Sequence, residues 1–327
     1  MSNNKPIRRI AIIGTGVIGA SWTALFLAKG LEVIATDIAP DAETALRRFV
    51  KAAWPALERL GLAPGASQSR LTFTADLPAA VRAADFVQEN GPERPDFKIK
   101  LFADMDDATP ADSIIASSSS SLTMSVIQSK CQRPERCLIG HPFNPPHIIP
   151  LVEVVAGAKT SPDAIQRALA FYAEIGKKPI LLRKELPGHV ANRLQIALYR
   201  EVLYLLEQDV LSVADADAAV SWGPGLRWGI MGPNLQFHLA GGVGGMKHFF
   251  EGVFEGLLPM FKTLGNPTIT PELKAKVTEG VLQEAGNRSV EQLAQDENQK
   301  LVALLRLRAD GSAAARAEER VATAGAS

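Results

Sequence analysis

The sequence predicts an α/β fold in which a doubly wound, mainly parallel sheet is followed by an all-α C-terminal domain. Up to about residue 184, short apolar runs alternate with segments of helical periodicity, whereas only helical periodicity follows residue 188. A Gly-x-Gly-x-x-Gly segment joins the first apolar run to the first helical segment. This alternation favours parallel strands, because each parallel pair needs a crossover connection, usually a helix.

Eight apolar runs are candidates for the strands of this sheet. They span residues 7–13, 32–36, 71–74, 86–88, 114–116, 137–140, 150–155 and 179–182. Helical patterns separate most of them, at 17–29, 41–60, 96–107 and 162–175. Pro55 lies inside the 41–60 pattern and predicts a break or a kink there, since proline has no N–H to donate within a helix.

The change of pattern predicts two domains, one at residues 1–186 and a helical one at residues 187–327. In the second part, apolar residues recur at helical spacing from Val190 to Leu205, and further helices are expected at 215–219 and 271–284. The Ala-, Arg- and Glu-rich tail from about residue 310 is typical of an exposed helix end or of a disordered terminus.

The charge balance indicates neither nucleic acid nor an anionic membrane as a partner, because Lys plus Arg and Asp plus Glu both number 35. The two cysteines, Cys131 and Cys137, form no disulfide framework and no metal-binding spacing with histidine, so no metal is expected. No apolar stretch approaches the roughly 18 residues of a membrane span, and the N-terminus has no secretory pattern. We therefore expect a cytoplasmic protein.

The glycine segment is placed as a dinucleotide-binding turn requires. Gly14 permits a tight turn after the strand, Gly16 lets the backbone approach a pyrophosphate, and Gly19 allows close packing of helix on strand. The first helical turn then offers free N–H groups to the phosphates. The expected cofactor contacts are Gly14, Gly16, Val17, Ile18 and Gly19.

Asp37 ends the second predicted strand, 18 residues after Gly19. A carboxylate at this point accepts hydrogen bonds from a ribose diol and repels a 2′-phosphate, so the predicted cofactor is NAD rather than NADP. The alternative interpretation is a glycine turn between packed elements, with a solvated aspartate beside it.

His141 and Glu153 are the candidate catalytic pair. His141 ends an apolar run, at the edge of the sheet where doubly wound folds bind ligands, and its pKa near neutrality suits proton exchange with an alcohol. Glu153 lies among aliphatic residues, where a carboxylate is costly to bury unless it is paired, and an imidazole is a natural partner. The alternatives are a structural histidine and a solvent-facing glutamate on an edge strand.

Two further polar features lie near the same edge. Ser117–Ser121 follows a predicted strand, so one of its hydroxyls could bind the substrate oxygen, although a serine run is also typical of a flexible loop. Asn192 opens the helical part, where its side chain could bind substrate or only the local backbone.

Five motifs in one order resemble the 3-hydroxyacyl-CoA dehydrogenase family over roughly residues 7–230. They are Gly14–Gly19, Ser120–Leu122, His141–Pro145, Leu151–Val154 and Pro187–Gly188 with Asn192–Arg193. The resemblance implies an NAD-binding, Rossmann-like first domain, a helical second domain for substrate and dimerisation, and a homodimer. It also implies roles for individual residues. His141 matches the acid/base and Glu153 its partner, Ser120 and Asn192 match residues that bind the reacting oxygen, and cofactor-site residues are matched by Glu93, Lys98 and Asn144.

The segment Gly225–Pro233 departs from the acyl-CoA pattern and resembles the branch with L-carnitine and L-gulonate 3-dehydrogenases. The expected activity is oxidation of the 3-hydroxyl of a small free hydroxy acid. The substrate that we expect first is L-carnitine, which would give 3-dehydrocarnitine. The alternatives are L-gulonate, a 3-hydroxyacyl-CoA, and a crystallin-like structural protein. Arg227 is the candidate for the substrate carboxylate, and Trp228 or Trp222 for a quaternary ammonium, unless these residues are solvated or pack between helices.

Overall fold

The computed structural model describes residues 5–324, with side chains as far as residue 309. Its residues form two compact units. The first comprises the described chain up to Asn192 together with Asn298–Leu307, and the second comprises Arg193–Glu297 and the chain from Arg308.

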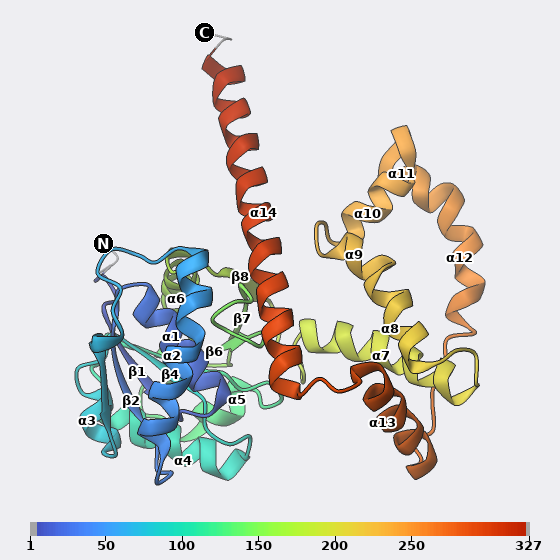
Figure 1. Ribbon diagram of the computed structural model, residues 1–327. Coiled ribbons are helices and arrows are strands. Elements are labelled where there is room, and N and C mark those ends of the chain that lie inside the picture. Colours follow the sequence, from blue (N-terminus) through green and yellow to red (C-terminus); the bar gives the residue numbers. More distant parts are fainter. Residues whose placement is uncertain (1–4, 325–327) are drawn as a thin grey trace. The chain divides into compact units, whose positions relative to one another are not determined.

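The first unit is built on one eight-stranded sheet in the order β3-β2-β1-β4-β5-β6-β7-β8 (Figure 1). The strands are β1 (Arg9–Ile13), β2 (Glu32–Thr36), β3 (Leu71–Thr74), β4 (Phe86–Glu89), β5 (Ile114–Ser117), β6 (Cys137–Pro142), β7 (Leu151–Ala156) and β8 (Lys178–Leu182). Neighbouring strands are parallel, except that β6 and β7 pair antiparallel. The predicted doubly wound, mainly parallel sheet is confirmed.

Helices cover both faces of this sheet because alternate strand residues point to opposite sides. The helices of the first unit are α1 (Val17–Ala28), α2 (Ala42–Leu60), α3 (Leu77–Val81), α4 (Pro95–Ala108), α5 (Met124–Ile127) and α6 (Pro162–Glu174). Ile12 and Phe86 belong to the apolar core shared with α1, α2 and α6. The neighbouring residues Ile13 and Val87 belong to a second core, shared with α3, α4 and α5.

Helix α2 continues through Pro55 without the break that the sequence predicts as one outcome. Proline removes the N–H that would bind the carbonyl of Lys51 four residues earlier. Both Pro55 and Lys51 are exposed, so this carbonyl faces solvent rather than the apolar core. Burial of Leu46, Val50 and Leu57 on the opposite side holds the helix on the sheet.

All elements of regular structure that are described in the second unit are helices. Its helices are α7 (Ala191–Glu207, beginning in the first unit), α8 (Val213–Ser221), α9 (Pro224–Trp228), α10 (Pro233–Ala240), α11 (Gly245–His248), α12 (Phe254–Phe261), α13 (Pro271–Ala285) and α14 (Val290–Ala324, of which Asn298–Leu307 belong to the first unit). Leu206, Val213 and Leu273 form its small buried core. Over the residues described, no helix is long and apolar enough to cross a membrane.

Candidate active site

Several predicted site residues lie where strands of the first unit end. In a doubly wound sheet, ligands bind outside the carboxyl ends of the strands, near the point where the strand order reverses. The order reverses here between β1 and β4. The glycine turn follows β1, the serine run begins at the end of β5, and His141 is the last residue but one of β6. The three motifs therefore gather at one edge of the sheet.

The glycine turn has the backbone geometry that each glycine was predicted to provide. Gly14 has a φ of 84°, in the left-handed region that favours glycine. A Cβ on Gly19 would lie only 1.9 Å from the Gly14 carbonyl oxygen, so α1 can approach β1 only if Gly19 has no side chain. At Gly16, a Cβ would meet no atom within 4 Å, so its outer surface is open.

The start of α1 fits the diphosphate of a dinucleotide. Gly16 is the N-cap, and no side chain caps the helix there. The N–H groups of Val17 and Ile18, in the first turn, therefore point outward at the positive end of the helix dipole. Open space beside Gly16 and uncapped N–H groups are what a bound diphosphate requires.

Asp37 lies beside this turn with a charged carboxylate. Its Oδ2 accepts hydrogen bonds from the N–H of Thr15 at 2.7 Å and from the Thr15 hydroxyl at 3.1 Å, and Oδ1 accepts from the N–H of Ala39 at 3.0 Å. Burial alone would raise the pKa of Asp37, but these hydrogen bonds outweigh burial and lower the pKa. The ionised carboxylate fits a ribose diol and repels a phosphate.

His141 and Glu153 are partners across the antiparallel pair of strands. The register places His141 of β6 opposite Glu153 of β7, and Nδ1 of the imidazole lies 2.9 Å from Oε2 of the carboxylate. Both side chains are buried, His141 at 6% and Glu153 at 0% exposure. The alternative of a solvent-facing glutamate on an edge strand is wrong, because Glu153 is buried and β7 lies between β6 and β8.

The second oxygen of Glu153 is held by the start of α7. Oε1 accepts the backbone N–H groups of Val190 at 2.9 Å and Ala191 at 3.0 Å. Burial alone would raise the pKa of Glu153, but the hydrogen bonds from His141, Ala191 and Val190 outweigh burial and lower it. An ionised carboxylate only accepts hydrogen bonds, so the proton of a neutral His141 lies on Nδ1 and the Nε2 lone pair is free to act as a base.

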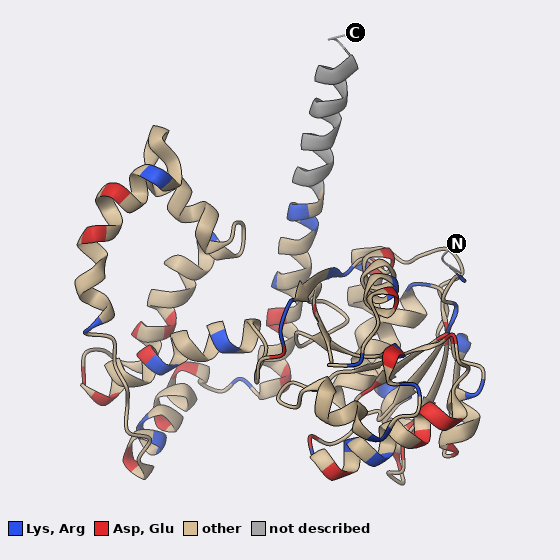
Figure 2. Ribbon diagram, turned by 180° about the vertical axis from the view of Figure 1, so that it is seen from behind, with Lys and Arg blue, Asp and Glu red and all other residues tan. Residues whose placement is uncertain are grey.

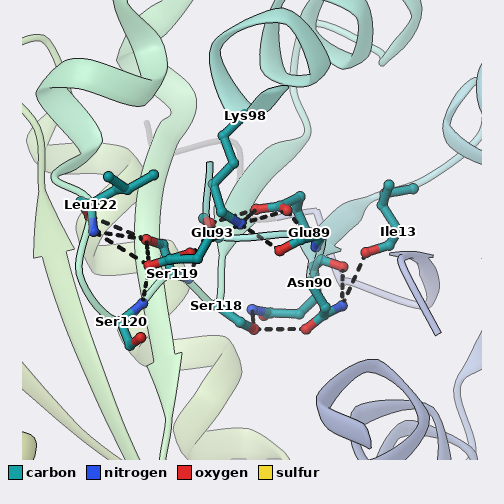
Figure 3. Close-up of polar contacts among 12 residues, drawn as sticks. Ile13, Glu89, Asn90, Glu93, Lys98, Ser118, Ser119, Ser120 and Leu122 are labelled. Carbon is teal, nitrogen blue, oxygen red and sulfur yellow. Dashed lines mark hydrogen bonds and ion pairs between the residues drawn. The ribbon is translucent and has the colours of Figure 1, made fainter. Parts of the chain in front are cut away.

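The serine run forms a loop that Glu93 binds by several hydrogen bonds (Figure 3). Oε1 of Glu93 accepts hydrogen bonds from the Ser119 hydroxyl at 2.6 Å and from the N–H groups of Ser120 at 2.9 Å and Ser121 at 2.8 Å. Burial would raise the pKa of Glu93, but these contacts and the charge of Lys98 lower it. Glu93 thereby fixes the backbone at Ser120.

Lys98 is buried at 1% exposure, and its ammonium lies next to Glu89 and Glu93. Its ammonium donates to both carboxylate oxygens of Glu89, at 2.7 and 2.9 Å, and lies 3.6 Å from Oε2 of Glu93 (Figure 3). Ser117 also donates to Glu89, at 2.5 Å. The buried ion pair is fully hydrogen-bonded, which is the condition for placing charges in an interior.

The remaining predicted residues are placed as follows. Asn192 is the second residue of α7, half-buried, and directly follows Ala191, which binds Glu153. Asn144 is exposed in the segment between β6 and β7. Arg227 and Trp228 are exposed on α9 of the second unit. Their chain neighbours connect Ser120 and Asn192 to the His141–Glu153 pair, since Ala191 binds Glu153 and Ser119 binds His189, whose ring lies against His141.

Two further residues of this region were not predicted from the sequence. His189 is buried at 2% exposure, and its ring lies 4.9 Å from the His141 ring between centroids. Lys177 donates to the carbonyls of Pro146 and Ile149, so it anchors the segment that joins β6 to β7. The sequence signal for His189 was its place in the Pro-Gly-His-Val-Ala-Asn motif; Lys177 stands in an ordinary strand entry and has no such signal.

Comparisons with known proteins agree with this geometry. The family model for the NAD-binding domain of 3-hydroxyacyl-CoA dehydrogenase matches residues 9–186, and the model for the C-terminal domain of the same family matches residues 188–284. Together these two matches cover most of the chain.

Similar proteins of known name point in the same direction. The chain is 48% identical to an L-carnitine dehydrogenase of Streptomyces griseus, covering 92% of this chain and 90% of that protein. It is 44% identical to an L-carnitine dehydrogenase of Bacillus cereus, covering 92% of both. Among solved structures, an NAD+-dependent 5-formyl-3-hydroxy-2-methylpyridine 4-carboxylic acid 5-dehydrogenase matches with a TM-score of 0.79 and 33% identity, over 93% of this chain and 99% of that one.

Proposed function

The chain belongs to the 3-hydroxyacyl-CoA dehydrogenase family and is an NAD-dependent oxidoreductase that acts on a CH–OH group; on this premise, we propose that it oxidises the 3-hydroxyl of L-carnitine to give 3-dehydrocarnitine. The observation that carries the substrate is the 44% to 48% identity to proteins named L-carnitine dehydrogenase, over nearly the whole chain. The same observation favours a free hydroxy acid over an acyl-CoA ester.

His141 is the proposed general base. Its Nε2 takes the proton of the substrate hydroxyl as the C–H hydrogen leaves with its electron pair and the C–O bond becomes a carbonyl. When bound, NAD supplies the acceptor for that hydride. Glu153, held ionised by three hydrogen bonds, stabilises the imidazolium that forms and keeps the ring in position.

Ser120 and Asn192 are the proposed partners of the reacting oxygen. Ser120 is held through its backbone by Glu93, and Asn192 is held at the helix start whose N–H groups bind Glu153. Groups fixed in advance stabilise developing charge without reorganising during the reaction. The geometry of both backbones supports this role, which also fits their match to the family motifs.

NAD is proposed to bind along the glycine turn and along the carboxyl ends of the strands. Gly14, Gly16 and Gly19 shape the turn, Val17 and Ile18 present N–H groups, and Asp37 faces the ribose. Three further residues are proposed to line the cofactor site: Glu93, Lys98 and Asn144. Of these, Lys98 acts through its neighbours, since its ammonium is buried against Glu89.

The polar ends of carnitine need a cation and an aromatic face. Arg227 and Trp228, neighbours on the exposed part of α9, are proposed to bind the carboxylate and the trimethylammonium group. A guanidinium grips a carboxylate by two hydrogen bonds, and an indole face attracts a quaternary ammonium.

The helical part is also proposed to form a homodimer. The enzyme is proposed to be cytoplasmic, with a domain boundary between residues 186 and 187. Apolar side chains stand exposed along α10, where Leu235 is 58% and Leu239 60% exposed. Figure 2 shows this helix without Lys, Arg, Asp or Glu. Large exposed apolar surfaces of this kind mark protein interfaces.

The test is a substrate screen with the purified protein and NAD, following NADH formation by its absorbance. The substrates are L-carnitine, L-gulonate, 3-hydroxybutyrate and 3-hydroxybutyryl-CoA, and D-carnitine is the matched control. We expect the highest kcat/KM with L-carnitine, by about tenfold or more, a margin that a few polar contacts can supply. A higher kcat/KM with the CoA ester or with gulonate would overturn the proposed substrate.

A further inference from the structure

His189 lies in a tight turn, and its side chain contacts His141 and the carbonyl of Ser119, the residue before Ser120. The turn has two residues in the left-handed region, Gly188 with a φ of 77° and His189 with a φ of 50°. Such a conformation is rare for a residue with a side chain and persists only where the surroundings enforce it. Directly after it, Val190 and Ala191 donate their N–H groups to Glu153.

The imidazole of His189 is fixed on both sides. Its Nε2 lies 2.9 Å from the carbonyl oxygen of Ser119, which can only accept, so Nε2 carries a proton. Its ring also lies against His141, with the centroids 4.9 Å apart and the planes 49° apart. One side chain therefore joins the loop that carries Ser120 to the imidazole of the proposed base.

The surroundings of the other nitrogen of His189 favour a neutral ring. Among the residues with described side chains, Nδ1 has no hydrogen-bond partner, and it is buried. A proton there would have no acceptor and would lie close to His141. Burial lowers the pKa of His189, and the neighbouring His141 lowers it further, whereas the Ser119 carbonyl and the carboxylates of Glu153 and Glu93 act in the opposite direction without reversing the shift.

We propose that His189 is a positioning residue of the reaction, which as a neutral imidazole holds the Ser120 loop and the His141 ring in one fixed arrangement. The reaction needs both groups at the same hydroxyl, but they come from different strand ends, β5 and β6. His189 is the side chain that bridges these two ends through a hydrogen bond and a ring contact. The proposal rests on the catalytic roles proposed above for Ser120 and His141.

Two variants separate the hydrogen bond from simple filling of space. His189→Phe keeps an aromatic ring against His141 but has no N–H for Ser119, whereas His189→Gln keeps an N–H donor near the place of Nε2 and cannot take a proton. Both side chains carry a Cβ, so the cost of the left-handed backbone is common to both. A comparison between them is therefore free of that cost.

The first measurement is the steady-state kinetics of the two variants with NAD and the best hydroxy acid of the screen. We expect His189→Phe to lower kcat by about 10-fold or more, with the KM for NAD unchanged, because loss of orientation acts on the chemical step. His189→Gln should recover most of the lost kcat. Equal kcat in both variants, whether low or at the wild-type level, would overturn the proposal.

The second measurement needs no substrate, so it separates a failure of this proposal from a failure of the proposed function. The chain has five histidines, so nitrogen-15 spectra of histidine-labelled protein can be assigned by the signal missing in His189→Gln. We expect His189 to carry its proton on Nε2 and to titrate below the ordinary histidine value, because burial lowers its pKa. A proton on Nδ1, or titration near pH 6.5, would overturn the proposal even if L-carnitine is a good substrate.

Discussion

His141 and Glu153 are register partners on the antiparallel strands β6 and β7, and a hydrogen bond of 2.9 Å joins Nδ1 of the imidazole to Oε2 of the carboxylate. β6 is parallel to β5, whereas β7 runs in the opposite direction. This reversal places Glu153, in the middle of β7, opposite His141 near the end of β6. The pair is therefore set by sheet pairing and not by a flexible loop.

Removal of the Glu153 charge should impair catalysis without affecting cofactor binding. Glu153→Gln keeps the shape of the side chain but does not stabilise the imidazolium, and its amide can donate to Nδ1, which would leave the proton of His141 on Nε2. We expect kcat to fall by about 100-fold or more, the usual scale of general acid–base catalysis. The matched control is Glu174→Gln, an exposed carboxylate at the end of α6, with wild-type kcat. Turnover like the wild type in Glu153→Gln would refute the role of the pair.

Asp37 should determine the choice of cofactor. Asp37→Ala removes the ribose acceptor, the charge that repels a 2′-phosphate, and the anchor of Thr15. We expect weaker binding of NAD and a smaller preference for NAD over NADP, measured as the ratio of kcat/KM values. Asp41→Ala, which removes an exposed carboxylate at the start of α2, is the control and should keep the wild-type ratio. A wild-type protein that prefers NADP would contradict this account of Asp37.

Arg227 and Trp228 should affect only substrates that have the polar ends of carnitine. Trp228→Leu should raise the KM for L-carnitine by about 2- to 30-fold, the equivalent of a cation–π contact of about 0.5–2 kcal/mol. Arg227→Ala should also reduce activity on 3-hydroxybutyrate, because both free acids carry a carboxylate. Equal losses on 3-hydroxybutyryl-CoA, together with a lower Tm, would show that α9 has a structural role instead.

Glu93 should control the order of the serine loop. Glu93→Ala leaves the N–H groups of Ser120 and Ser121 without their acceptor, so these amides should exchange with solvent faster. Hydrogen exchange of a peptide covering residues 117–123, followed by mass spectrometry, measures this change, and kcat should fall by about 10-fold or more. Unchanged exchange in this peptide would show that other contacts order the loop.

His147 should make the protein less stable in mild acid. The Ser21 hydroxyl accepts the backbone N–H of His147, so its own proton goes to Nδ1, and the ring is neutral. Burial, together with the charge of Lys177, lowers the pKa of His147 from 6.5 to about 4. As the pH falls below 6.5, the unfolded chain binds a proton on His147 before the folded protein does. The folded protein therefore has its full stability above pH 6.5 and loses about 3 kcal/mol of it as the pH falls to about 4.

The variant His147→Asn tests this dependence, because its side-chain oxygen can accept from Ser21 but does not titrate. Its free energy of unfolding, measured with denaturant from pH 7.5 to pH 4, should fall less steeply than that of the wild type. Parallel curves for the two proteins would show that His147 does not titrate as the structure indicates.

The strands could be predicted from sequence because a parallel sheet is buried on both faces. Its strands are therefore short apolar runs, and glycine and proline residues mark the ends of these runs. The catalytic pair could be nominated because a buried glutamate needs a partner, although the register that joins Glu153 to His141 was not deducible from composition. The dinucleotide turn was visible because each of its glycines answers a local backbone requirement.

Other contacts could not be predicted, because they depend on tertiary structure. His189 binds Ser119 across 70 residues of sequence, and only the fold brings the left-handed turn to the serine loop. Glu93 resembles a surface residue in the sequence, yet it binds a loop 26 to 28 residues away. Arg227 and Trp228 were chosen from a departure in a family pattern, so their role remains a prediction.

The most direct test of the central claim is the rate of NADH formation from L-carnitine by the wild type and by His141→Ala, at saturating NAD and neutral pH. The account predicts steady turnover by the wild type, a kcat at least about 100-fold lower in the variant, and equal Kd values for NAD in the two proteins. Wild-type turnover by His141→Ala would contradict the account, because the hydroxyl proton would then leave by a route that does not need His141.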